Sequence, residues 1–198
     1  MNILLDAMPN FLMVNDQKIM IDSGFRTWIR FDEALFWNSD PMEQRIYAAM
    51  QVCYGEEIPA DINSAVRAAI AFYAQTDQPF EEAQSDEQND QSIPARNNRT
   101  YSFTYDASLI CAAFLSQYGI DLTKDDLHWW HFKALFEGIE GESKICKIME
   151  IRAMDLSKVK DKESKVHYHR LKRLYRLPDP RSEDEQEADM LDAFSAMF

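Results

Sequence analysis

Apolar residues recur at helical spacing along most of this chain of 198 residues. A period near 3.6 residues places such side chains on one face of an α helix. Prolines, glycines and polar capping residues mark where each apolar stretch starts and stops. Together these signals predict helices over residues 23–36, 41–53, 59–73, 107–118, 124–137, 142–152 and 157–177.

A different pattern precedes the first helix. Two short β-prone runs, Phe11–Val14 and Lys18–Ile21, flank residues 15–17, whose side chains tolerate turn geometry. We therefore expect a small N-terminal hairpin. The scarcity of glycine, with 5 in the chain, favours helices over a β sandwich that needs many tight turns. The predicted fold class is mainly α, with residues 1–178 forming a single compact helical domain.

The segment Leu127–Phe136 carries large apolar side chains on more than one helical face. We expect Thr123 to cap this helix and Gly138 to end it. A helix of this kind needs cover on two sides. The cover could be the rest of the domain, another subunit or a client chain. The candidate anchors for a partner are Trp129, Phe132 and Phe136, and they could equally belong to the core.

Two segments stand apart from the helical pattern. Residues 77–99 are polar and acidic, with little to bury, which predicts a flexible insert or an acidic docking arm. Residues 179–198 begin with an acidic spacer and end with an amphipathic stretch. A second set of candidate anchors lies there, at Leu191, Phe194 and Phe198. Packing of this tail on its own subunit is the alternative.

Charge is unevenly distributed along the chain. The net charge is -13, yet residues 144–176 hold 11 basic and 4 acidic side chains. The helix around Lys158–Arg176 could bind RNA or DNA, or its lysines could simply face solvent. Because the rest of the chain would repel nucleic acid, we expect acidic protein surface as the more natural partner.

The residues with reactive or ligating side chains suggest no chemistry. Cys53, Cys111 and Cys146 are widely spaced, which indicates reduced thiols and no zinc site. His128 and His131 lie three apart on one helical face, but without a neighbouring ligand they are expected to be structural. No phosphate-binding loop, dinucleotide motif or catalytic triad is present. We expect no catalytic residue, cofactor or metal.

The start of the chain shows neither a basic region nor a signal-peptide cleavage site. Its apolar runs are far shorter than the roughly 18 residues that span a bilayer. These observations predict a cytoplasmic protein that does not contact membranes.

Five blocks of sequence together resemble a known family. They are Tyr105-Asp106, Cys111–Leu122, Leu127–Phe136, Lys147–Arg152 and Met154–Lys162, and Phe25–Phe31 also fits. With these blocks, the chain is similar to the small cytoplasmic tail-region proteins of long-tailed phages and prophages of Gram-positive bacteria. The resemblance covers most of residues 9–178.

The resemblance implies a tail assembly chaperone, because the family's genes usually lie near those of the major tail protein and the tape measure. Such a protein would keep the tape-measure protein soluble in the host cytoplasm while tail tube subunits assemble around it. It would be absent from the finished virion and would act by binding, without catalysis. The major tail tube protein and a second copy of the chain are further candidate partners.

Two other functions compete with this interpretation. One is a nucleic-acid-binding module that uses the Lys158–Arg176 helix, for which binding would weaken steeply with salt. The other is an acidic host-interaction protein that presents a phosphate-like surface.

Overall fold

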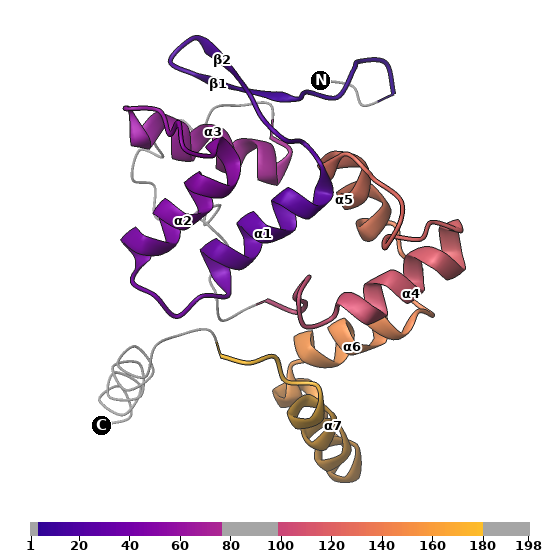
Figure 1. The fold of residues 1–198 in the computed structure, drawn as a ribbon. Coiled ribbons are helices and arrows are strands. Elements are labelled where there is room, and N and C mark those ends of the chain that lie inside the picture. The colour runs from indigo at the N-terminus through magenta and orange to yellow at the C-terminus, as the bar shows by residue number, and fades with distance from the viewer. Residues whose placement is uncertain (1–3, 77–98, 180–198) are drawn as a thin grey trace, which may run out of the picture.

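A computed structural model describes residues 4–76 and 99–179 of the chain. The predicted fold class is confirmed, since these residues form a β hairpin and seven α helices (Figure 1). The elements are β1 (Phe11–Val14), β2 (Gln17–Met20), α1 (Phe25–Phe36), α2 (Met42–Tyr54), α3 (Ile62–Ala74), α4 (Ala107–Tyr118), α5 (Trp129–Glu137), α6 (Lys144–Ala153), the short 3-10 turn η2 (Leu156–Lys158) and α7 (Lys162–Leu174). The predicted insert, apart from Arg99, and the tail from residue 180 lie outside the described residues.

The hairpin is tighter than the sequence suggested. Its loop consists of two residues, Asn15 and Asp16, with φ angles of 48° and 61°. Positive φ at both positions matches the twist of the flanking strands, and Asn and Asp tolerate this conformation. The pairing of Phe11 with Met20 then sets a register that points Leu12 and Val14 inward, against α3.

The helices pack around one core, to which residues before and after the insert both contribute. The helices α1 and α2 lie side by side, α3 lies beneath the hairpin, and α4 packs on α6 (Figure 1). An isolated antiparallel bridge between Gly24 and His128 joins the starts of α1 and α5. In it, the Phe25 amide donates to the Leu127 carbonyl at 2.9 Å. This bridge places α5 against α1, and buried side chains from both parts of the chain form one hydrophobic cluster.

Two predicted helix starts are wrong. Helix α5 begins after His128, because the segment from residue 121 to 125 forms a turn in which Thr123 donates to the Asp121 carboxylate. This turn is held to α1 by Arg26, which donates to the Leu122 carbonyl at 2.9 Å and pairs with the exposed Asp126. Helix α7 likewise begins after Asp161, where a side-chain cap binds the Ser164 amide. A polar side chain next to an apolar run can stabilise a turn or cap a helix, and the pattern of apolar and polar residues does not distinguish the two roles.

The face of α3 that enters the core differs in part from the predicted one. The sequence pattern places Ile62, Val66, Ala69, Ile70 and Tyr73 on one face, and of these Ala69 is buried, together with Ala65 and Phe72. The small alanines allow α3 to lie close to its neighbours. Ile62 is consequently left at the surface.

Candidate partner-binding surfaces

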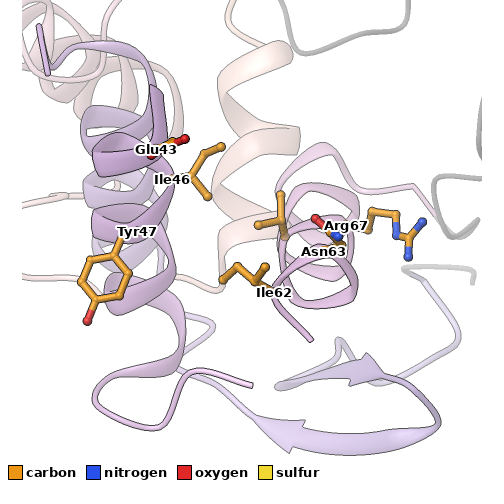
Figure 2. A pocket seen from close by; sticks show the side chains of 7 residues that line it. Glu43, Ile46, Tyr47, Ile62, Asn63 and Arg67 are labelled. Carbon is orange, nitrogen blue, oxygen red and sulfur yellow. The ribbon is translucent and has the colours of Figure 1, made fainter. Parts of the chain in front are cut away.

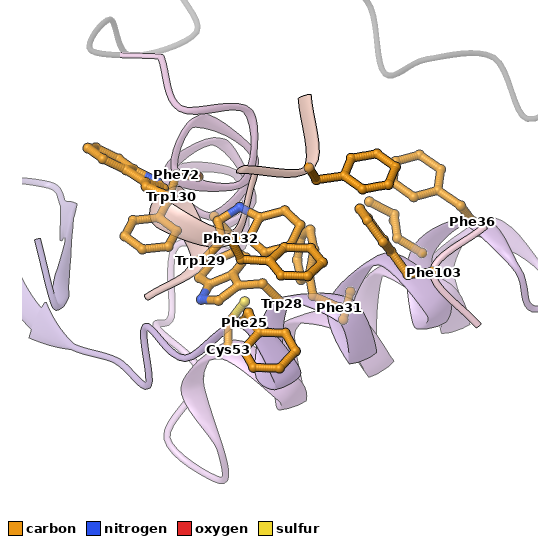
Figure 3. Close-up of a cluster of buried hydrophobic side chains, with 14 of the residues drawn as sticks. Phe25, Trp28, Phe31, Phe36, Cys53, Phe72, Phe103, Trp129, Trp130 and Phe132 are labelled. Carbon is orange, nitrogen blue, oxygen red and sulfur yellow. Dashed lines mark hydrogen bonds between the residues drawn. The ribbon is translucent and has the colours of Figure 1, made fainter. Parts of the chain in front are cut away.

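The aromatic side chains of α5 lie in the core. Trp129, Phe132 and Phe136 are 1%, 0% and 7% exposed. The ring of Phe132 stacks against that of Phe25 with centroids 4.9 Å apart (Figure 3). It also stacks against the ring of Phe114, at 5.1 Å. The sequence left open whether the rest of the domain, another subunit or a client chain covers this helix. The structure shows that other residues of the same chain cover it. These three side chains therefore offer no surface to a partner of the folded protein.

Polar atoms of α5 complete the end of α3. The indole nitrogen of Trp129 donates to the Tyr73 carbonyl at 3.0 Å, and that of Trp130 donates to the Phe72 carbonyl at 2.8 Å. Lys133 reaches the next carbonyl, that of Ala74. The last carbonyls of a helix have no partner within it, so these bonds satisfy groups that would otherwise be buried unpaired. Both the apolar and the polar groups of α5 are thus used inside the fold.

His128 has a structural role. Its Nδ1 accepts a hydrogen bond from the Trp130 amide at 3.1 Å, which caps α5, and its Nε2 lies 2.8 Å from the Pro9 carbonyl. With Nδ1 accepting, Nε2 carries the proton and donates to Pro9. Burial lowers the pKa of His128, which favours this neutral form. Within residues 4–76 and 99–179, no three His, Cys, Asp or Glu side chains gather as metal ligands would.

Asp32 interrupts the apolar stripe of α1, and the structure explains why. Its carboxylate accepts hydrogen bonds from Arg99 at 2.7 Å, from Trp37 at 3.2 Å and from the Tyr73 hydroxyl. The guanidinium of Arg99 also lies over the Phe36 ring. Arg99, which the sequence placed in the polar insert, is instead 9% exposed at its side chain and anchored in the core.

These contacts shift the pKa values of the groups around Asp32. Burial and the neighbouring carboxylate raise the pKa of Tyr73 well above its usual value. Burial opposes the charged form of Arg99, but the attraction of Asp32 more than offsets it and raises the pKa of the guanidinium. Perturbed groups of this kind often mark catalytic sites. Here Asp32 is 1% exposed, so no substrate can reach it, and we interpret the cluster as a structural ion pair.

A second buried ion pair ties α6 to the segment before α4. Arg152 binds both oxygens of Asp106, at 2.6 and 2.9 Å, and donates to the carbonyls of Thr100 and Tyr175. Asp106 occupies the N-cap position of α4, but its side chain makes no capping hydrogen bond and instead accepts hydrogen bonds from Arg152 and from the Ser102 amide. A bidentate pair of this type fixes orientation as well as distance. It joins α6, the start of α4 and the end of α7.

An apolar groove of about 660 Å³ lies between α2 and α3. Ile46 and Ile62 project into the space between the two helices, while Tyr47 extends outward from α2 (Figure 2). Tyr47 is 55% exposed and Ile62 is 40% exposed. The lining contains two charged residues, Glu43 and Arg67. This groove is a concave and mainly apolar surface of the described residues, and it is the candidate binding site.

The sequence held a signal for this groove that the helical pattern obscured. Helix α2 buries Ala49, Met50 and Cys53, and Ile46 is half-buried on the same face, yet Tyr47 is a large apolar residue that falls beside that face. An apolar surplus on a helix whose core face is already complete indicates a second contact. On α3, Ile62 was predicted to lie on the core face, so its exposure and its place in the groove were not recognised. The other candidate anchors, Leu191, Phe194 and Phe198, lie outside the described residues.

The basic segment predicted at Lys158–Arg176 lies mainly on α7, which extends away from the other helices (Figure 1). None of its residues is buried. Val166 and Leu174 are among the most exposed apolar side chains of the described residues, at 66% and 68%. This helix is therefore a second surface available to a partner.

The described residues form a fold made mainly of helices, with an apolar groove on its surface. The family model for the bacteriophage Gp15 protein matches residues 4–177, and the chain belongs to this family. It is accordingly a phage structural or assembly protein. No curated protein and no solved structure matches the chain significantly. Among the described residues, no helix is long and apolar enough to cross a membrane.

Proposed function

We propose that this protein is a tail assembly chaperone that holds an amphipathic segment of the tape-measure protein in the groove between α2 and α3. It would act in the host cytoplasm, without catalysis, and leave before the virion is complete. The family assignment supports a phage assembly role, and the resemblance to tail-region proteins supports this particular client. The observation that carries the proposal is the exposed apolar lining of the groove.

The groove has the chemistry that helix recognition requires. Amphipathic helices bind by inserting apolar side chains at positions three and four residues apart into an apolar groove. The branched side chains of Ile46, Ile62 and Val66 supply such a lining, and Tyr47 offers a large aromatic contact with a polar tip. Aromatic residues of this kind dominate binding energy at many interfaces. Glu43 and Arg67 provide one charge of each sign for orienting the client.

The proposal is tested by co-expressing the protein with the tape-measure protein of the same phage. The test variant is Tyr47→Ser/Ile62→Ser. A matched control is Tyr105→Ser/Leu115→Ser, which removes one aromatic and one aliphatic side chain of similar exposure from outside the groove. All variants are first compared by urea unfolding to establish that they fold.

We expect the wild type and the control to keep the tape-measure protein soluble and to co-purify with it. The groove variant should retain about tenfold less client, because two central apolar contacts are lost. If the wild type fails to solubilise the client, the chaperone proposal is wrong. If the groove variant performs like the control, the client binds elsewhere, and the tail residues Leu191, Phe194 and Phe198 become the next candidates.

The exposed basic surface of α7 is the observation that favours the nucleic-acid alternative. The net charge of -13 opposes it. The host-interaction alternative remains a prediction from the charge of the chain.

A further inference from the structure

Helix α7 has one face that packs and one that does not. Its half-buried residues, Ser164, Tyr168, Leu171 and Tyr175, follow one another at helical spacing. At the end of this helix, Arg152 donates to the Tyr175 carbonyl at 2.6 Å, and Lys172 donates to the Met154 carbonyl at 2.7 Å. The helix is thus fixed to the body at its C-terminal end and along a single face.

The opposite side of α7 is a basic face, consisting of Lys162, Lys165, His169 and Arg173, with Arg170 and Arg176 beside them. All six side chains are exposed, and none pairs with an acidic group among residues 4–76 and 99–179. Other exposed lysines, such as Lys124 and Lys147, do have acidic partners. Like charges clustered along one side of a helix repel one another, so this face is suited to an acidic partner.

The sequence supplies an acidic segment immediately after this helix. Residues 180–198 hold six acidic side chains and one basic side chain, and five of the acidic ones fall in the segment Glu183–Asp189. Five residues, 175–179, separate the end of α7 at Leu174 from residue 180. The 13 residues of α7 extend about 20 Å at 1.5 Å per residue. A seven-residue segment in extended conformation spans about 23 Å, so Glu183–Asp189 is long enough to run back along the helix.

We propose that the acidic segment Glu183–Asp189 lies on the basic face of α7 of the same chain. Two other partners could in principle neutralise this face. Attachment to α7 gives the segment an effective concentration in the millimolar range, which favours it over the same segment of a second copy. Nucleic acid would have to approach a chain of charge -13.

This contact would have a consequence for specificity. The acidic segment acts as an internal competitor that hides the basic face from the RNA and DNA of the host cell. The proposal does not depend on the identity of the client in the groove.

The first test maps the contact in the full-length wild-type protein. A carbodiimide joins carboxylates to lysines that are in direct contact, and mass spectrometry locates the joined residues. We expect links from residues 183–189 to Lys162 or Lys165 in the monomer fraction, with a yield that falls by at least about half when salt is raised from about 50 to 500 mM. Links confined to a dimer fraction, or no links to α7, would overturn the proposal.

A charge-reversal variant tests whether these links depend on the charge of the basic face. Arg173→Glu should lower the yield of these links by at least about half, because it places a like charge opposite the acidic segment. The matched control is Arg30→Glu on α1, an exposed arginine without an acidic partner among the described residues. It changes the net charge equally and should leave the yield unchanged. Equal losses in both variants would contradict a local contact.

The second test asks whether the segment hides the basic face. The test variant neutralises five acidic residues of the tail, at Glu183, Asp184, Glu185, Glu187 and Asp189, by substitution with the matching amides. The control neutralises five in the insert, at Asp77, Glu81, Glu82, Asp86 and Glu87, and so reaches the same net charge.

Binding is measured with a fluorescent duplex of about 20 base pairs at about 50 mM salt, where phosphate contacts are strong. The tail variant should bind at least about tenfold more tightly than the control, and added Arg173→Glu should abolish this gain. Equal binding by the tail variant and the control would show that the net charge of the protein, and not the acidic segment on α7, determines how tightly the duplex binds. That result would overturn the proposal.

Discussion

The helices α5 and α7 are both rich in side chains that suggest binding, yet the structure uses them in opposite ways. Four of the nine residues of α5 are buried, and its indole nitrogens cap α3. None of the 13 residues of α7 is buried. The comparison shows that the number of aromatic side chains in a helix indicates how much apolar surface other residues must cover. Whether that helix is exposed depends on its neighbours in the fold, which come from distant parts of the sequence.

The largest expected effect comes from breaking the aromatic stack of α5. Phe132→Ala should lower the free energy of unfolding by about 3–5 kcal/mol, because it removes a fully buried ring and leaves a cavity between Phe25 and Phe114. Leu174→Ala on α7 is the comparison, with an expected change within about 0.5 kcal/mol. Urea unfolding followed by tryptophan fluorescence measures both. Similar losses for the two variants would mean that α7 is covered in solution.

A smaller effect is expected at the ion pair that supports the same core. Arg99→Met leaves the carboxylate of Asp32 buried without a cation, which should cost about 3 kcal/mol in unfolding free energy. Arg30→Met, on the exposed side of α1, should cost little. The double variant Asp32→Asn/Arg99→Met should lose less than the sum of the two single changes, since neither charge is then left alone. Additive losses would show that the two residues act independently.

The smallest effect concerns the histidines of the two helices. Because burial lowers the pKa of His128, the folded state binds fewer protons than the unfolded state at mildly acidic pH. The stability that its neutral form provides is therefore complete above the unfolded pKa, near 6.5, and decreases as pH falls below it. Urea unfolding at several pH values between about 7.5 and 5.5 measures this decrease.

His128→Asn keeps a capping side chain and should remove part of the pH dependence. His167→Asn, at an exposed position of α7 outside the basic face, should retain it. An unchanged pH profile in the His128 variant would mean that other groups cause the loss of stability.

The fold was largely predictable because its helices are bounded by local signals. Gly119 ends α4, as the sequence indicated, and α3 begins after its cap Asp61, three residues beyond the predicted start. The hairpin followed from β-prone runs around Asn15 and Asp16. Such signals act within a few residues, so they can be recognised in the sequence without knowledge of the tertiary structure. The errors arose where a polar residue bonds to a distant partner, as Arg26 does with the turn before α5.

The candidate site was less predictable, for a related reason. The sequence marked Trp129, Phe132 and Phe136 as able to bind but could not say what covers them. Phe25 and Phe114, which stack on Phe132, are remote in sequence, and only the packing reveals them. The groove was missed because Tyr47 on α2 and Ile62 on α3 indicate a second contact on each helix, but not that the two contacts share one hollow. A concave surface is a property of the arrangement and has no counterpart in the periodicity of either helix.

The bridge between Gly24 and His128 also affects the order in which the chain can fold during synthesis. Helix α1 leaves the ribosome early, but the ring that stacks on Phe25 arrives more than 100 residues later, at Phe132. At roughly 5–20 residues per second, the ribosome needs on the order of 5 to 20 seconds to add this length. During that interval the apolar face of α1 lacks its final partner. A protein expected to protect another chain from aggregation would therefore itself pass through a period of exposure while it is being made.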